Sequence, residues 1–468
     1  MKAALQCIHL MTEQFHIAVF DAGKTSCKLV LLNGGNYAEI EVLRQEFLVL
    51  QGPPYPHLDI DAMWSFLCDS LAVFETKYGI DALAITTHAC TAGLVDADEL
   101  VLPILDYEYE IPPELATEYD DLRPAFEKTF SPRMPGGLNL GAQLHFLRAT
   151  FPKEYASAAL YLTFPQYWSW RLTGVARSER TFLGAHSDFW LPKQGTYSPL
   201  VGVEFPEKLF APMSLAGDTA PANEIAAKAT GLKPGTPVTS GIHDSNASLL
   251  PWLDTGGAMS VVSSGTWAIV MSVGGTLDRL DPARDMLANV DAHGRAVPTA
   301  RFMGGREYQM LTGGVIEEIS ISDIKGVIAN DTCPLPGRIS GVGPFPLGPG
   351  GWTGSSPETD QAKIAGATLY LAMMSDTCLS LVGTGDRVVI EGPFAKNTTY
   401  AQLLTTLIEC PVHLSTDITG TATGAAMLLG YAPPRVLGPP LKPMEIEGLS
   451  AFRDKWRKLS AAGSTLGK

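Results

Sequence analysis

The sequence is poor in the features that mark several large classes of protein. Its 7 cysteines among 468 residues are scattered and never stand in C-x-x-C spacing, which argues against a zinc site and a disulfide framework. No apolar run reaches the length of a membrane span, and the N-terminal segment is too weakly apolar for a secretory signal. We therefore expect a cytoplasmic protein with free thiols and no membrane partner.

Positive charge is also scarce. The chain has 34 Lys and Arg against 49 Asp and Glu, a formal net charge of −15. Phosphate backbones are held by clustered basic side chains, so nucleic acid is not expected as a partner. With 46% hydrophobic and 18% charged residues, the chain can bury sizeable cores, and its length predicts two domains.

A complete P-loop is absent as well, although Gly23-Lys24-Thr25 looks like the end of one. Ala18 stands where a P-loop requires its first glycine. The residues before Asp21 and after Ser26 are strand-like, so the stretch predicts a strand, a tight turn from Asp21 to Ser26, and a second strand. The N–H groups and hydroxyls of such a turn can hold a phosphate, with Asp21 at its mouth.

The rest of the first half alternates helix-like and strand-like segments, which is typical of an α/β core. Apolar spacing predicts helices over 61–74 and 140–151 and a buried strand over 82–86. A short strand over 241–244 precedes a helix-like segment at 246–250.

The second half repeats the opening pattern. Strand-like residues 259–262 and 267–271 flank the small polar turn Ser263-Ser264-Gly265-Thr266. Two such hairpins suggest two similar domains facing one another. Further on, strands are predicted at 387–390 and 411–414 and helices near 400–408 and 421–429.

The resulting domain boundaries are as follows: a loose leader over 1–14, a first domain over 15–254, a second over 255–435, and a surface tail over 436–468.

Four motifs, taken in order, resemble those of the FGGY family of carbohydrate kinases. Asp21 to Lys28 resembles the family's first phosphate loop, D-x-G-T-T-S-x-K, and Gly241-Ile242-His243-Asp244 its G-x-H-D catalytic loop. Ser264 to Trp267 resembles the second phosphate loop, and Glu391 to Asn397 the adenosine loop. The resemblance covers about residues 14 to 430.

The resemblance implies an α/β fold of two actin-like (ribonuclease H-like) ATPase domains with a central cleft. It also implies ATP-dependent phosphorylation of a small-molecule sugar, with ATP and Mg²⁺ as cofactors and a homodimer as a common assembly. Closer likenesses, such as YPHLDID, GLNLGAQL, FPQYWSWRLTG and RFMGGREY, point to kinases of L-rhamnulose and related deoxyketoses such as L-fuculose. Pentuloses such as xylulose or ribulose are the alternative.

The family's roles transfer onto matching residues. Asp244 would be the catalytic base, because a sugar hydroxyl must lose its proton as the bond to phosphorus forms. A helix N-cap is the alternative role for Asp244. Asp21, together with Asp244, would hold Mg²⁺. The residues expected around the nucleotide phosphates and adenosine are Asp21, Gly23, Lys24, Thr25, Ser26, Gly265, Thr266, Gly304, Gly305, Gly392 and Asn397.

Several of these assignments stay open. Lys24 replaces the family's usual Thr and either adds charge beside the γ-phosphate or points to solvent. Asn397 is either an adenosine contact or a helix N-cap, and Pro393 replaces a family glycine. The expected sugar-binding residues are His243, Asp244, Ser245, His88, Asp106 and Glu108. His88 follows a buried strand, where a structural role is the alternative, and the sugar-binding acid is either Asp106 or Glu108.

Two functions of other classes share the phosphate hairpins: an actin- or Hsp70-like ATPase, and a non-catalytic sensor of sugar or nucleotide. The ATPase would not need a His-Asp pair. The sensor does not turn over a substrate, so the presence of both Asp21 and Asp244 argues against it.

Overall fold

The protein forms two compact units. A computed structural model describes residues 15–253, 255–315, 319–415, 420–430 and 437–462. Unit 1 comprises Met1–Asp254, Asn289–Ala296 and Thr419–Arg435, and unit 2 comprises Thr255–Ala288, Val297–Ile418 and Val436–Lys468. The main division at 254/255 is the one the sequence suggested. The leader predicted at 1–14 lies outside the described residues.

Two segments belong to unit 1 although the sequence assigned them to the second domain, namely Asn289–Ala296 and Thr419–Arg435. For Thr419–Arg435 the reason is packing, because helix α15 (Gly420–Met427) lies against α10 (Asp244–Leu253) and strand β1 (His16–Ala22). A Cβ on Gly424 would lie 1.7 Å from the carbonyl oxygen of Ala247, so only glycine permits this approach.

The sheet of unit 1 has the order β11-β12-β4-β1-β2-β3, and β13 also pairs with β4. β1 and β2 are antiparallel, β2 and β3 are antiparallel, and β4 runs parallel to β1. The strands after β1 are β2 (Ser26–Asn33), β3 (Glu39–Glu46), β4 (Ala82–Thr87), β11 (Thr219–Pro221), β12 (Pro237–Thr239) and β13 (Ile242–His243).

Both faces of this sheet are covered, as the apolar residues of β1 require. Phe20 belongs to one core with α2 (Ile60–Lys77) and α7 (Phe164–Thr173), and its ring centroid is 5.3 Å from that of Trp168. Val19, which points to the other face, belongs to a second core with α10 and α15.

The sheet of unit 2 has the order β16-β17-β15-β14-β18-β19. β14 and β15 form an antiparallel hairpin, β17 extends it, and β18 and β19 run parallel to β14. The strands are β14 (Met259–Ser264), β15 (Ala268–Val273), β16 (Met286–Val290), β17 (Ala296–Phe302), β18 (Val388–Glu391) and β19 (Val412–Leu414). Strands β17-β15-β14-β18-β19 thus repeat the arrangement β3-β2-β1-β4-β12, and the expectation of two similar domains is confirmed.

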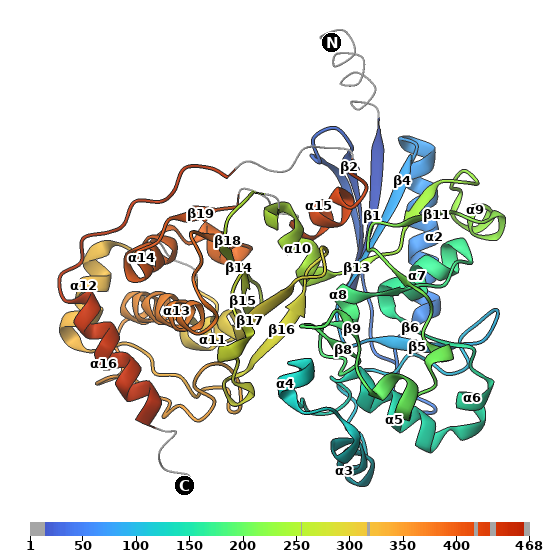
Figure 1. The fold of residues 1–468 in the computed structure, drawn as a ribbon. Helices are drawn as coiled ribbons and strands as arrows, with labels where there is room; N and C mark the ends of the chain where they lie inside the picture. Colours follow the sequence, from blue (N-terminus) through green and yellow to red (C-terminus); the bar gives the residue numbers. More distant parts are fainter. Residues whose placement is uncertain (1–14, 254, 316–318, 416–419, 431–436, 463–468) are drawn as a thin grey trace. The chain divides into compact units, whose positions relative to one another are not determined.

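Helix α13 (Asp360–Val382) forms the core of unit 2 and packs against β15 (Figure 1). It is long and apolar enough to cross a membrane, which corrects the expectation that no stretch reaches that length. However, 89% of its most apolar window is buried inside the fold, so it serves as a core helix. Its neighbours are α11 (Gly304–Thr312), α12 (Ile321–Asn330), α14 (Thr398–Ile408) and α16 (Leu449–Ala462).

Smaller elements complete unit 1. Its short strands are β5 (Ala92–Val95), β6 (Leu160–Thr163), β7 (Ser178–Glu179), β8 (Trp190–Leu191), β9 (Thr196–Tyr197) and β10 (Met213–Ser214). Its further helices are α3 (Pro113–Leu122), α4 (Phe126–Thr129), α5 (Leu140–Thr150), α6 (Pro152–Ser157), α8 (Arg180–Leu183) and α9 (Glu224–Thr230).

Candidate active site

The first hairpin is a strand pair with a tight turn, as predicted, and not a P-loop. Asp21 pairs with Lys28, and Ala22 with Cys27, so the turn spans only residues 23–25 and is shorter than expected. The N–H of Gly23 donates to the carbonyl of Ser26 at 3.0 Å. A Cβ on Gly23 would lie 2.9 Å from that oxygen, which explains the glycine.

Asp21 is the penultimate residue of β1 and lies near a second carboxylate, that of Asp244. Burial raises its pKa to about 6, the nearby Lys28 opposes this rise, and the charge of Asp244 adds to it. The ammonium of Lys28 lies 3.8 Å from the Asp21 carboxylate. The two acids expected to hold Mg²⁺ are therefore close enough to repel each other. Thr25, in the turn, is exposed.

Asp244 begins helix α10 and has three donors on one of its oxygens. Its Oδ1 accepts from the N–H of Ser245 at 2.6 Å and from the Ser245 hydroxyl at 3.2 Å, and lies 3.1 Å from His243 Nε2. Burial alone would raise the pKa of Asp244, but His243, the nearby His88 and the Ser245 N–H outweigh it and hold this pKa below the usual value. Oδ2 is used by none of these three contacts.

The catalytic loop before Asp244 is held by helix α7. Gln166 is fully buried, and its Nε2 donates to the carbonyls of Ser240 and Gly241, both at 3.0 Å. Gly241 has a φ of +96°, which glycine adopts without strain. The segment FPQYWSWRLTG thus positions the loop. The sequence predicted no role for Gln166, although the segment itself resembles one in the family.

A second support reaches the loop from Glu179. The N–H of His243 donates to the hydroxyl of Thr181 at 3.3 Å, and that hydroxyl donates to buried Glu179 at 2.5 Å. Asn246 Nδ2 lies 3.0 Å from His243 Nδ1 and donates to it, so the hydrogen-bond network places the ring proton on Nε2, beside Asp244. A buried Asn inside an apolar helix was the one sequence signal for this role.

His88 has both ring nitrogens engaged by the protein. Nδ1 donates to the carbonyl of Ala22 at 2.9 Å, and Nε2 lies 2.9 Å from the Thr91 hydroxyl. Burial lowers the pKa of His88, so the ring is neutral at pH 7. These contacts favour the structural alternative for His88 over direct sugar binding.

The side chain of Lys24 is turned toward two carboxylates and not toward solvent. Its Nζ is 2.9 Å from Asp106 Oδ1 and 2.7 Å from Glu108 Oε1, and it stands 4.3 Å from the centroid of the Tyr107 ring. Only 13% of the Lys24 side chain is exposed. The solvent-facing alternative is therefore wrong, because two carboxylates attract the ammonium group inward.

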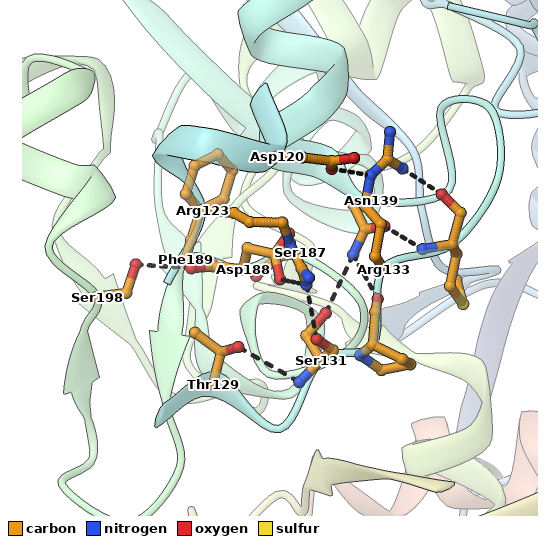
Figure 2. Close-up of polar contacts among 12 residues, drawn as sticks. Asp120, Arg123, Thr129, Ser131, Arg133, Asn139, Ser187, Asp188, Phe189 and Ser198 are labelled. Carbon is orange, nitrogen blue, oxygen red and sulfur yellow. Dashed lines mark hydrogen bonds and ion pairs between the residues drawn. The ribbon is translucent and has the colours of Figure 1, made fainter. Parts of the chain in front are cut away.

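A polar network positions the acidic segment Asp106 to Glu108. The N–H of Gly137 donates to the Tyr107 carbonyl at 3.0 Å, and Asn139 holds the loop before it through the Ser131 hydroxyl at 3.2 Å. Figure 2 shows Arg123 joining this loop to Asp188: it donates to the Ser131 carbonyl at 2.8 Å and to the Asp188 carboxylate at 2.9 Å. The segment GLNLGAQL, which contains Asn139, thus supports the candidate sugar site.

Unit 2 contains a cavity of about 980 Å³ that several of the residues expected to bind nucleotide line, although Gly304 and Gly392 do not. Gly265, Thr266, Gly305, Asn397 and the backbone-stiffening Pro393 all contribute to its lining. The family's second phosphate loop and adenosine loop therefore meet at one cavity.

Two glycines are required at this cavity. A Cβ on Gly305 would lie 2.1 Å from the carbonyl oxygen of Gly265, and one on Gly392, whose φ is +75°, would lie 2.1 Å from that of Ser264. Gly304, which precedes Gly305, begins α11 and is buried. The Ser264 hydroxyl donates to the Glu391 carbonyl at 2.6 Å and accepts from the Phe394 N–H at 2.9 Å. Sequence reasoning did not give Ser264 this linking role.

Asn397 is the N-cap of α14. Its Oδ1 accepts from the N–H of Tyr400 at 2.9 Å, so the N-cap alternative is confirmed. Because Asn397 also lines the cavity, its adenosine contact stays a prediction.

Unit 1 has another groove, of about 810 Å³, beside Trp64, Tyr167 and Arg171. None of the predicted site residues lines it, and one of its carboxylates, Asp59, caps helix α2. We therefore place the candidate site at Asp21 and Asp244.

The donor set at Asp21 and Asp244 fits Mg²⁺. Magnesium prefers oxygen ligands and binds through one or two carboxylates, with phosphates and water completing its shell. Burial is the main cause of the raised pKa of Asp21, and the charge of Asp244 adds to it; a divalent cation would offset both effects. Among the described residues, no group of three or more His, Cys, Asp or Glu could hold a metal by itself.

Comparisons with known proteins agree with this geometry. The model of the N-terminal domain of the FGGY family of carbohydrate kinases matches residues 16–251, and that of the FGGY C-terminal domain matches residues 256–436. An L-fuculokinase from Salmonella typhi is 23% identical over 458 residues, covering 89% of this chain and 92% of that protein. An L-fuculokinase from Escherichia coli is 23% identical over 447 residues, with the same coverage of both chains.

Solved structures agree as well. A carbohydrate kinase from Novosphingobium aromaticivorans aligns with a TM-score of 0.87 at 33% identity, covering 95% of this chain and 98% of that one. A xylulose kinase from Rhodospirillum rubrum aligns with a TM-score of 0.76 at 18% identity, covering 96% and 98%, and supports the fold alone. The chain therefore belongs to the FGGY family of carbohydrate kinases and is an ATP-dependent sugar phosphotransferase with that family's two-domain α/β fold.

Proposed function

We propose that the protein phosphorylates a hydroxyl of a free, neutral ketose, most specifically a deoxyketose such as L-rhamnulose or L-fuculose, in carbohydrate catabolism. The two L-fuculokinase relatives, which align over nearly the whole chain, support this substrate class. A pentulose such as xylulose or ribulose is the second candidate, which the sequence resemblance left open.

The observation that carries the proposal is the setting of Asp244. Its pKa is held low by His243 and the Ser245 N–H, so the carboxylate is ionised at pH 7. As the sugar oxygen forms its bond to the γ-phosphorus, its proton passes to Asp244 and the bond between that phosphorus and ADP breaks.

The neighbouring groups position the reactants. In this proposal the backbone N–H groups around Gly23 and the hydroxyls of Thr25 and Ser26 hold the transferred phosphoryl group, and the cavity of unit 2 receives the nucleotide. Asp21 and Asp244 would hold Mg²⁺, which supplies charge neutralisation at the β- and γ-phosphates. His243 keeps the Asp244 carboxylate oriented through its Nε2 proton.

A coupled ADP-release assay with Mg-ATP tests the proposal. The acceptors are L-rhamnulose, L-fuculose, L- and D-xylulose, D- and L-ribulose and glycerol. We expect one ketose to drive turnover, with kcat/KM clearly above that of the other acceptors. ADP release that needs no sugar would favour a chaperone-like ATPase. ATP binding without turnover on any acceptor would favour a sensor.

A further inference from the structure

Lys24 connects two parts of unit 1 that the sequence treats separately. It stands in the turn of the first hairpin, at a position of the first phosphate loop where the family usually has a Thr. Its ammonium group instead lies against Asp106, Glu108 and the face of Tyr107. The ammonium group thus forms ion pairs with two carboxylates, at 2.9 Å from Asp106 Oδ1 and 2.7 Å from Glu108 Oε1.

We propose that Lys24 is a positioning residue of the acceptor-sugar site: it ties the segment Asp106 to Glu108 to the phosphate turn and thereby sets the affinity for sugar. This inference rests on the proposed function, since it assigns a role within the same site.

The geometry of Asp106 identifies the acid that contacts sugar. Its Oδ1 accepts from the N–H of Glu108 at 3.1 Å and forms an ion pair with Lys24 Nζ at 2.9 Å. Both contacts use Oδ1, which leaves Oδ2 for a further donor such as a sugar hydroxyl. The Asp106 side chain is 10% exposed and that of Glu108 66%. A buried, oriented carboxylate is a directional acceptor, whereas an exposed one stays hydrated, so Asp106 contacts sugar and Glu108 balances the charge of Lys24.

The segment also lies near the catalytic carboxylate. Burial is the main cause of the raised pKa of Tyr107, and the charges of Glu108, Asp106 and Asp244 add to it. Burial likewise lowers the pKa of His88, where the charge of Lys24 contributes in the same direction while that of Asp244 opposes it. Lys24, its two acids and Asp244 therefore form one electrostatic cluster within unit 1.

The charges of this cluster bear on the acceptor. Its charged groups are Lys24, Lys28, Asp21, Asp106, Glu108 and Asp244. Each lysine stands beside at least one carboxylate, so no cation is left over for an anionic sugar. The site accordingly suits a neutral polyol and disfavours an aldonate such as D-gluconate.

Sugar binding and kinetics of Lys24→Met test the proposal. With the ketose that drives ADP release fastest, calorimetry should give a sugar Kd raised by about tenfold or more, because a charge-assisted contact is lost. The KM for ATP should stay within about twofold of the wild type, since this cluster lies in unit 1. Lys24→Arg should recover a large part of the affinity, because a guanidinium can also bridge two carboxylates. Lys233→Met, which removes an exposed lysine paired with Glu75, is the matched control.

A double variant separates positioning from a general loss of charge. If Lys24 acts through Asp106, the sugar Kd of Lys24→Met combined with Asp106→Asn should equal that of Asp106→Asn alone. A Lys24→Met protein with unchanged sugar affinity and a raised KM for ATP would overturn the proposal, as would tighter binding of D-gluconate than of the ketose. Calorimetry does not need turnover. A wild type that binds the ketose without phosphorylating it would contradict the proposed function alone, and Lys24→Met would still decide the role of Lys24.

Discussion

The hairpins β1–β2 and β14–β15 occupy the same position in two sheets of the same strand order, yet their turns differ in chemistry. The first turn is flanked by Asp21 and carries Lys24, which is engaged by two carboxylates. The second presents the exposed, uncharged residues Gly265 and Thr266 beside a large cavity. One scaffold thus carries an acidic cluster in unit 1 and, in unit 2, a cavity lined by glycines and by the basic residues Arg306 and Lys396.

The difference follows from what each site must hold. A base that takes a proton from a sugar needs a carboxylate, which repels a polyphosphate at short range. A nucleotide site is better built from backbone N–H groups, which glycine lets approach closely. The two units can share a fold because their chemistry resides in a few turn residues.

Among the predicted variants, the one that removes the base Asp244 should have the largest effect, a fall in kcat with the sugar Kd nearly unchanged. Asp244→Asn keeps the size of the side chain but cannot accept the hydroxyl proton, so kcat should fall by roughly 10²- to 10⁴-fold. The sugar Kd should change little. Steady-state kinetics and calorimetry check both values, with Asp69→Asn, an exposed acid on α2, as control. Near-normal turnover would remove Asp244 as the base.

A methyl group at Gly305 should weaken nucleotide binding at the cavity of unit 2. Its Cβ would lie 2.1 Å from the Gly265 carbonyl oxygen, so Gly305→Ala forces the two nucleotide loops apart. We expect the KM for ATP to rise by about tenfold or more, with the sugar Kd unchanged. Gly326→Ala on α12, where a Cβ meets nothing within 4 Å, is the matched control. Equal ATP affinity in both variants would argue against nucleotide binding at this cavity.

The smallest expected effect is on the pH dependence of the free energy of unfolding. Burial raises the pKa of Glu179 to about 7 in the folded protein, against the usual 4.5. Between these values the folded state binds more protons than the unfolded state, so this group makes stability fall as pH rises from about 4.5 to about 7. The full loss is at most about 3 kcal/mol. Denaturant titrations of wild type and Glu179→Gln across this range check it: the variant should lack this fall, and parallel curves would refute it.

The sequence predicted the parts of the fold with strong periodicity or turn signals. Both hairpins, α2 and α5 lie close to where they were expected. Helix α13 was missed, because it is buried on almost every side and so has no amphipathic stripe to detect. The assignment of Thr419–Arg435 to unit 1 was also missed, since it depends on long-range packing of α15 on α10.

For the site, residue types in motifs were predictable and their partners were not. The sequence indicated Asp21 from the motif that it begins and Asp244 from the motif that it ends. It could not place Lys24 beside Asp106, because the ion pair joins segments more than 80 residues apart. Gln166 and Thr181 hold the catalytic loop through its backbone groups, and Asn246 holds it through the ring of His243; such contacts leave no spacing in the sequence.

The central claim is that Lys24, in the turn of the first hairpin, supports sugar binding, whereas the turn of the second hairpin borders the nucleotide cavity. The most direct test is paired calorimetry of Lys24→Met and Gly305→Ala, each titrated with the acceptor ketose and with a non-hydrolysable ATP analogue. We predict crossed results: Lys24→Met loses sugar affinity and keeps nucleotide affinity, and Gly305→Ala does the reverse. Loss of nucleotide affinity in Lys24→Met with sugar binding intact would contradict the account.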